Sequence, residues 1–194
     1  MIETEKAALL IVDVQKDFCP GGALPAPNGD GIIPALNEHL AEARERDMPV
    51  YASRDWHPAV TSHFKEYGGE WPPHCVQGTE GAQFHGDLKL PADAIVISKG
   101  DDAGKAGYSA FDGRTKDGTT LLHDLHDRRV TRLYVGGIAT DYCVKATALD
   151  ALQAGLDVRV LRDAITGIDV RPGDARRALE EMSRNGAQVV DRID

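Results

Sequence analysis

A cysteine at the start of a helix-like pattern is the first feature of this 194-residue sequence that could support chemistry. In "LYVGGIATDYCVKATALDALQAG" (133–155), an apolar run ends in Gly-Gly, a polar turn follows, and Cys143 opens the predicted helix. Thr140 or Asp141 can cap that helix, and its dipole and free amides would then favour a thiolate at Cys143. The same amides could hold an oxyanion near the sulfur. The alternative is a small buried filler, because free cysteines often pack in cores.

A carboxylate and a lysine follow two other apolar runs. Asp13 interrupts "LLIVDVQ", where a buried aspartate is costly unless it is paired or its pKa rises. Lys99 ends "AIVISK". The alternatives are a loop-capping role for Asp13 and a solvated strand end for Lys99. With Cys143 they form a plausible catalytic set, in which the aspartate takes the thiol proton and the lysine holds both groups electrostatically.

A cluster of imidazoles and one carboxylate suggests a metal site. "RDWHPAVTSHF" supplies Asp55, His57 and His63, and "EWPPHC" adds His74. Neutral imidazoles with one carboxylate suit zinc, iron or manganese, although any single histidine here could be structural. Cys75 is expected to pack rather than to bind metal. The remaining histidines are expected on helix or loop surfaces, without a site role: His39, His85, His123 and His126.

The elements that must position these residues alternate between strands and helices. Continuous apolar runs predict strands at 7–14, 49–54, 94–98, 132–138, 157–162 and 187–191. Amphipathic or helix-length segments predict helices at 32–48, within 118–129, after Cys143, and near 172–186.

This alternation predicts an α/β fold, a three-layer α/β/α domain with a doubly wound parallel sheet of about six strands. Ligands of such sheets bind at the carboxyl ends of the strands. Asp13, Asp55, Lys99 and Cys143 all come at or just after predicted strand ends, so they are expected to converge on one edge. One domain spanning 1–194 is expected, since no linker or internal repeat interrupts the chain.

Composition excludes several function classes. A formal net charge of -9 argues against binding to a phosphate backbone. No Gly-x-Gly-x-x-Gly pattern follows the first strand, which leaves dinucleotide binding unsupported. No run approaches the ~18 apolar residues that span a bilayer, the N-terminal stretch lacks signal-peptide features, and three cysteines suit reduced thiols. We therefore expect a soluble cytoplasmic protein with a small-molecule partner, no nucleic acid and no membrane; a homo-oligomer is possible.

Three aromatic residues fall in loops on the expected ligand-binding edge. Phe18, Trp71 and Tyr108 could sandwich a flat ring, or they could anchor the loops by burial.

Taken in order, the motifs resemble those of a known family. "LLIVDVQKDFCPGGAL", "SRDWHP…SHF", "WPPHCVQGTEGAQFH", "ISKG…YSAFDG" and "VGGIATDYCVKATALDA" resemble the nicotinamidase branch of the isochorismatase-like cysteine hydrolases, over roughly residues 7–165. The resemblance implies hydrolysis of nicotinamide to nicotinic acid and ammonia through a thioester, with pyrazinamide as a side substrate and NAD salvage as a role. Relatives that act on other substrates are understood to lack the metal cluster.

The resemblance also implies residue roles. Asp13, Lys99 and Cys143 would form the catalytic triad, and the amides of Ala139 and Cys143 the oxyanion hole, after a cis peptide bond between Ile138 and Ala139. One divalent ion, zinc before iron or manganese, would bind the pyridine nitrogen of the substrate. The residues implied for its site are Asp55, His57 and His74, with His63 matching a ligand found in some members. Those implied for the substrate pocket are Phe18, Trp71, Tyr108 and Ile138.

Two other functions stay open on the sequence. A relative with the same fold could act on another small amide or vinyl ether, and a non-catalytic domain could bind a small ligand, or a partner protein, through the same pocket. The metal motif disfavours the first, and the presence of Asp13, Lys99 and Cys143 disfavours the second.

Overall fold

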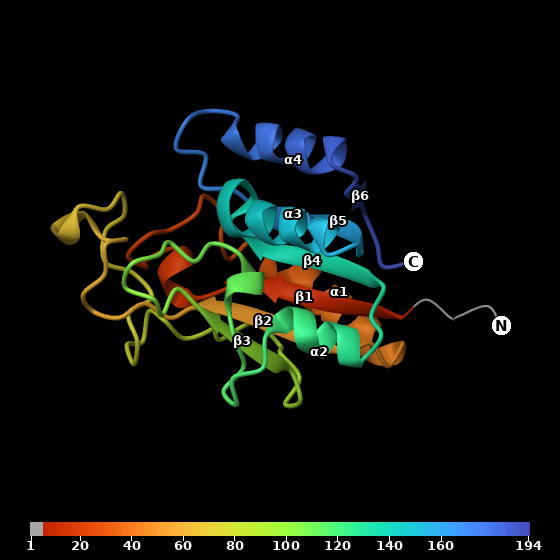
Figure 1. The fold of residues 1–194 in the computed structure, drawn as a ribbon. Helices are drawn as coiled ribbons and strands as arrows, with labels where there is room; N and C mark the ends of the chain where they lie inside the picture. Colours follow the sequence, from red (N-terminus) through yellow and green to blue (C-terminus); the bar gives the residue numbers. More distant parts are fainter. Residues whose placement is uncertain (1–5) are drawn as a thin grey trace.

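Six parallel strands form one sheet in the order β3-β2-β1-β4-β5-β6 (Figure 1). A computed structural model describes residues 6–194, so the first five residues of the expected 1–194 domain lie outside the described part. The strands are β1 (Ala7–Val12), β2 (Val50–Asp55), β3 (Ile95–Lys99), β4 (Arg132–Ile138), β5 (Asp157–Thr166) and β6 (Gln188–Val190). The predicted parallel sheet is confirmed, and β1 and β4 flank the point where the strand order reverses, which is where such sheets bind ligands.

Helices cover both faces of the sheet. They are α1 (Ile33–Glu45), α2 (Leu121–Asp127), α3 (Lys145–Gln153) and α4 (Asp174–Arg184). Alternation along β1 separates two apolar clusters: Leu9 and Ile11 pack in the one that contains α1, and Leu10 packs in the one that contains α2, α3 and α4. Figure 1 shows α2 and α3 on the near side of the sheet. The three-layer α/β/α architecture is therefore confirmed.

Several element ends differ from the sequence-based bounds. β1 stops at Val12 because Asp13 adopts a left-handed backbone (φ 50°) and turns the chain out of the sheet. β5 runs four residues beyond the predicted 162, to Thr166. The second helix begins at Leu121, where the Thr120 side chain accepts the His123 N–H and caps it.

One glycine lets two strands meet beside the ligand-binding edge. Gly137 has φ +126°, and a Cβ there would lie 2.1 Å from the Val12 carbonyl oxygen. Any other residue would push β4 away from β1 at this height. Gly137 therefore sets the spacing between the strand that leads to Asp13 and the strand that leads to Cys143.

The segment between β2 and β3 forms irregular loops at the carboxyl edge, where Figure 1 shows them projecting from the sheet. Its only helical turn among the described residues is a short 3-10 turn, Lys65–Tyr67. Backbone hydrogen bonds from Lys16 to Gln83 and from His85 to Val14 tie it to the loop after β1. Within residues 6–194, no helix has the length and apolar character needed to cross a membrane.

Candidate active site and metal centre

An aspartate, a lysine and a cysteine from three strand ends meet in the protein interior. Asp13 follows β1, Lys99 ends β3, and Cys143 lies beyond β4. The Lys99 Nζ is 2.8 Å from Asp13 Oδ2 and 3.4 Å from Cys143 Sγ. The other Asp13 oxygen accepts a 2.7 Å hydrogen bond from the Ser53 hydroxyl, on β2. The three predicted residues are therefore in mutual contact through one ammonium group.

Lys99 is fully buried, so the alternative of a solvated strand end is wrong. Its ammonium also donates to the Asp55 carboxylate and, at 3.2 Å, to the Gly107 carbonyl. Burial alone would lower the pKa of Lys99, but the carboxylates of Asp13 and Asp55 outweigh it and raise the pKa well above its usual value. Lys99 is thus a permanent cation between two buried carboxylates.

The expectation of a thiolate at Cys143 is wrong. Burial is the main cause that raises the pKa of the Cys143 thiol well above its usual value; Lys99 opposes it, and Asp13 and Asp55 reinforce it. A hydrogen bond to Asp13 acts in the same direction. Burial also raises the pKa of Asp13, while Lys99 opposes this. Cys143 therefore rests as a thiol directed at a carboxylate that can accept its proton.

The local helix around Cys143 also differs from the expected capped helix. Thr140–Val144 form a π-helical turn before α3, and the N-cap residue is Ala139, with no side-chain capping bond. The Asp141 carboxylate instead accepts the N–H groups of Ile168 and Asp169, at 3.0 and 2.8 Å, and so anchors the loop after β5. The helix N-terminus is therefore formed by the backbone alone.

The peptide bond between Ile138 and Ala139 is cis, as the resemblance implied. It joins the end of β4 to the π-helical turn, whose Tyr142 and Val144 N–H groups both donate to the Ala139 carbonyl. Ala139 thus lies directly before this turn and Cys143 lies within it.

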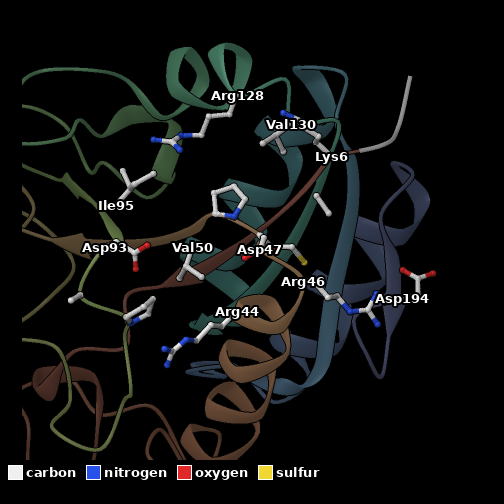
Figure 2. A pocket seen from close by; sticks show the side chains of 15 residues that line it. Lys6, Arg44, Arg46, Asp47, Val50, Asp93, Ile95, Arg128, Val130 and Asp194 are labelled. Carbon is white, nitrogen blue, oxygen red and sulfur yellow. The ribbon is translucent and has the colours of Figure 1, made fainter. Parts of the chain in front are cut away.

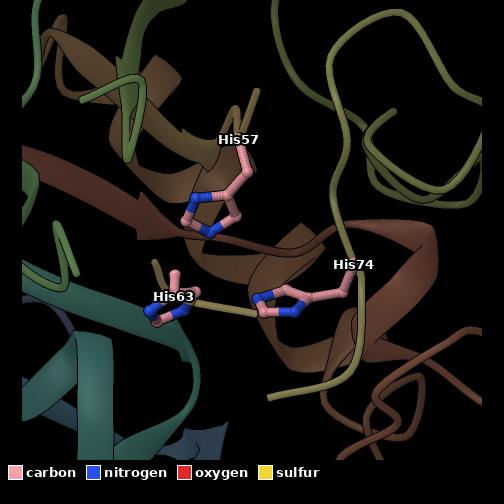
Figure 3. A group of neighbouring side chains, drawn as sticks. All are labelled: His57, His63 and His74. Carbon is pink, nitrogen blue, oxygen red and sulfur yellow. The ribbon is translucent and has the colours of Figure 1, made fainter. Parts of the chain in front are cut away.

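Three imidazole rings converge next to this group (Figure 3). The rings of His57, His63 and His74 each offer a nitrogen atom, and these atoms lie within 4.8 Å of one another. His57 lies two residues after the end of β2, and the other two come from the loop that follows. Burial, and after it His57 and His74, lower the pKa of His63 to about 4. Burial also lowers the pKa of His74. Both rings are therefore neutral at pH 7, which is the form that binds metal.

The donor set fits a divalent metal ion. His57 Nδ1 contacts the Gly100 carbonyl oxygen at 2.9 Å, and His74 Nδ1 contacts the Pro72 carbonyl oxygen at 2.8 Å. These contacts leave both Nε2 atoms for a ligand, and the His57 Nε2 is buried without a hydrogen-bond partner in the described chain. Asp55 Oδ2 lies 3.5 Å from His57 Nε2 and 3.9 Å from His74 Nε2. A bound cation would satisfy an orphaned nitrogen and a carboxylate oxygen together.

Asp55 contacts both the buried triad and the three imidazoles. One of its oxygens accepts the Lys99 ammonium and the other faces the imidazoles. Burial would raise the pKa of Asp55, but Lys99 and His57 outweigh it and hold the pKa well below its usual value. Asp55 is therefore ionised, and it links the triad to the candidate metal site electrostatically.

Two of the four predicted pocket residues line a cavity of about 230 Å³ beside His63. They are Trp71 and Tyr108, and the Trp71 indole N–H donates to the Tyr108 hydroxyl at 3.0 Å. Phe18 and Ile138 do not line this cavity, because they pack in the apolar cluster on the α1 side. The Phe18 ring still lies 5.5 Å from that of His74, so it borders the imidazole group.

Two residues outside the predicted site are buried. His39, expected on a surface, is buried on α1, and its Nε2 lies 2.9 Å from Asp163 Oδ1. The helix periodicity allowed an exposed position, but a polar contact to β5 made burial possible. Cys75 is fully buried in the apolar cluster of α1, in line with the expectation that it packs.

Gln15 is a buried site residue that the sequence reasoning missed. Its amide NH₂ group donates to the carbonyls of Asp55 and Ala82, at 2.8 and 2.9 Å, and its oxygen accepts the Asp55 N–H at 2.7 Å. Gln15 thus holds both backbone polar groups of Asp55. The available signal was an amide two residues after Asp13, at the end of the apolar run.

We expect Gln15→Leu to lower the free energy of unfolding by roughly 2 to 4 kcal/mol, because it leaves buried backbone groups of Asp55 and Ala82 unpaired. It should also weaken metal binding, since Asp55 loses its support. Urea unfolding and competition with a coloured chelator measure the two effects. Gln77→Leu is the control, because it removes one exposed bond to the Trp56 carbonyl. Equal effects of the two variants would contradict the assigned role.

A larger cavity lies at the opposite edge of the sheet, and neither the triad nor the three imidazoles line it. It has a volume of about 1220 Å³ and surrounds the amino ends of β1, β2 and β3 (Figure 2). Its charged side chains are of both signs: Lys6, Arg44, Arg46, Arg128, Asp47, Asp93 and Asp194. Because the triad lies at the carboxyl edge of the sheet, that edge, and not this cavity, is the candidate active site.

Comparisons with known proteins agree with this assignment. Residues 7–194 match the isochorismatase domain. The chain is 44% identical to the nicotinamidase/pyrazinamidase of Mycobacterium tuberculosis, over 94% of this chain and 97% of the relative. It is 42% identical to the nicotinamidase of Escherichia coli, over 94% and 93%. The pyrazinamidase of Pyrococcus horikoshii, solved in complex with zinc, superposes with a TM-score of 0.88 at 48% identity, covering 97% of this chain and 99% of that one. Motifs, fold and buried site thus agree, and the chain belongs to the isochorismatase domain family.

Proposed function

We propose that this protein is a metal-containing cysteine amidohydrolase that converts nicotinamide to nicotinic acid and ammonia. The observation that carries the proposal is the Lys99 ammonium, which lies 2.8 Å from Asp13 Oδ2 and 3.4 Å from Cys143 Sγ in a fully buried position. A thiol, a carboxylate and a cation in contact are the parts that acyl transfer through a covalent intermediate needs. The neighbouring imidazoles and the 44% identical relative support the choice of a pyridine carboxamide.

In the first half of the reaction, Cys143 Sγ attacks the carboxamide carbon while Asp13 takes the thiol proton. The Ala139 and Cys143 amides would hold the negative oxygen of the tetrahedral intermediate. Asp13 then returns the proton to the amide nitrogen, the C–N bond breaks, and ammonia leaves a thioester on Cys143. Lys99 keeps its charge throughout and orients the Asp13 carboxylate.

In the second half, Asp13 takes a proton from water, whose oxygen attacks the thioester carbon. The C–S bond breaks, the sulfur recovers a proton from Asp13, and nicotinic acid is released. One water is consumed for each amide, so atoms and charge balance.

The residues proposed to hold the metal are Asp55, His57, His63 and His74. Zinc is the preferred ion, because three imidazoles and one carboxylate are ligands that Zn²⁺ favours; iron or manganese would also suit them. When bound, the ion would supply a Lewis acid that fixes the ring nitrogen of the substrate. Pyrazinamide, which also has a ring nitrogen, is a proposed second substrate. A role in NAD salvage, a cytoplasmic location and the oligomeric state stay predictions.

Ammonia release from nicotinamide by the metal-replete protein is the direct test of this function. Stoichiometric release of ammonia and nicotinic acid is the expected result. No release would refute the proposed substrate, and a panel of other small amides would then identify the reaction.

Removal of the metal is expected to raise the Kd for nicotinamide about tenfold or more, because each lost 1.4 kcal/mol of binding is a factor of ten. Binding is measured in a Cys143→Ala background, which prevents turnover, with verified metal-free protein. Benzamide is the control ligand: it has no ring nitrogen, so its Kd should not respond. An unchanged Kd for nicotinamide would contradict ring-nitrogen binding.

A further inference from the structure

The cavity beside His63 has one ionised side chain at its edge. The residues that line it are Ser62, His63, Gly69, Glu70, Trp71, Ala106 and Tyr108. Glu70 is exposed, and no cation lies within ion-pair distance of it among residues 6–194. The only other titratable groups in this lining are His63, which is neutral at pH 7, and the Tyr108 phenol. Among the side chains that line this cavity, Glu70 is therefore the one that carries a charge at pH 7.

The Glu70 carboxylate affects the pKa of two aromatic residues, Tyr108 in the cavity lining and Tyr142 next to it. Burial is the main cause that raises the pKa of Tyr108; the hydrogen bond with Trp71 opposes the rise, and the charge of Glu70 adds to it. Burial also leads the rise in the pKa of Tyr142, to which Glu70 contributes as well. The Tyr142 ring lies 5.0 Å from that of Trp71 and 5.7 Å from that of Tyr108. Glu70 thus lies close enough to this aromatic group to place a negative potential on it.

The substrate and the product of the proposed reaction differ in charge. The carboxamide is neutral, whereas hydrolysis leaves a carboxylate that is ionised at pH 7. At the edge of a cavity with aromatic side chains in its wall, the field of a charge is screened less than in bulk water. Glu70 would therefore repel the product while leaving the neutral amide without a net electrostatic penalty.

We propose that Glu70 is a specificity residue that selects against anionic ligands, so that the carboxylate product is held more weakly than a pocket with a neutral mouth would hold it. The inference rests on the proposed function, since that function supplies the identity of the anion. With Glu70 in this role, the pocket would prefer neutral ring carboxamides as ligands and would release the carboxylate product more readily.

The test compares nicotinate and nicotinamide as ligands of metal-loaded protein, by calorimetry in the Cys143→Ala background. With Glu70→Gln added, the ratio of the nicotinate Kd to the nicotinamide Kd should fall about two- to tenfold, as removal of one partly screened charge implies. In the parent background this ratio should also fall as salt is raised, and it should respond less to salt after the substitution. Glu70→Asp keeps the charge and should restore the parent ratio.

Glu66→Gln is the matched control. Glu66 carries the same charge on the same loop, and it does not line the cavity. An equal fall in the ratio for the Glu66 and Glu70 variants would overturn the proposal in favour of an effect of overall charge. An unchanged ratio in the Glu70 variant, with both ligands still bound, would overturn the proposal for Glu70 and leave the proposed function intact. Failure of nicotinamide to bind any variant would refute the proposed function, and this inference with it.

Discussion

Cys143→Ala is expected to lower kcat for nicotinamide hydrolysis by about 10⁴-fold or more, because it removes the sulfur that would form the thioester. The sulfur lies 3.4 Å from the Lys99 ammonium and within 4.8 Å of an Asp13 carboxylate oxygen. No hydroxyl or second thiol is proposed to take its place. Ammonia release under single-turnover conditions measures the loss, and mass spectrometry of the unmodified enzyme should detect the acyl group on Cys143.

A control cysteine separates lost chemistry from lost packing. Cys19 is also a buried free thiol, and burial, followed by the charge of Asp30, raises its pKa to about 11. Cys19→Ala should keep kcat within a few-fold of the parent, and both variants should lose no more than about 1 to 2 kcal/mol of unfolding free energy. Near-normal turnover in Cys143→Ala would refute the covalent mechanism.

Lys99→Met is expected to lower the free energy of unfolding by about 3 to 5 kcal/mol at neutral pH, and kcat by about 10²- to 10³-fold. The methionine keeps the length of the side chain but leaves the carboxylates of Asp13 and Asp55 facing each other without a cation. Both carboxyls are buried, so neither is stabilised by solvent. Urea unfolding of the metal-free protein and steady-state kinetics measure the two losses.

The stability loss in Lys99→Met should depend on pH in a defined direction. Without Lys99, burial and mutual repulsion raise the folded-state pKa of the two carboxyls above the unfolded values. Groups with a raised folded pKa contribute stability at low pH that is lost as pH rises through that pKa. The variant should therefore approach the parent protein in acid and fall furthest below it at neutral and mildly alkaline pH.

Lys145→Met is the control for this substitution. Lys145 is a partly exposed lysine on α3 that contacts Glu181 at 3.3 Å, so its loss should cost no more than about 1 kcal/mol. A similar cost for the two lysines, or a loss in Lys99→Met that is independent of pH, would show that the buried ammonium does not hold the two carboxylates.

The link between the triad and the candidate metal site runs through a single carboxylate. Asp55 accepts the Lys99 ammonium with one oxygen and faces two imidazoles with the other. Gln15 holds its backbone from the loop that carries Asp13. The two halves of the site are therefore built on one rigid set of strand ends, which favours a fixed distance between the reacting carbon and the ring nitrogen of a substrate.

The sequence by itself determined the elements and the set of candidate residues. Six apolar runs separated by helix-length segments predicted the parallel sheet, because strand and helix patterns are local properties of the chain. The positions of Asp13, Lys99 and Cys143 at strand ends predicted their convergence, because the ends of parallel strands share one edge. Five motifs in order were enough to indicate the family.

Only the tertiary structure decided the protonation states and the shared contacts. The helix around Cys143 suggested a thiolate, but burial and the carboxylates of Asp13 and Asp55, which come from distant parts of the chain, keep the proton on sulfur. Strand order, the burial of His39, the support of Asp55 by Gln15 and the place of Glu70 at the cavity also required the folded chain. Each depends on which residues far apart in sequence become neighbours, and local sequence patterns do not specify such contacts.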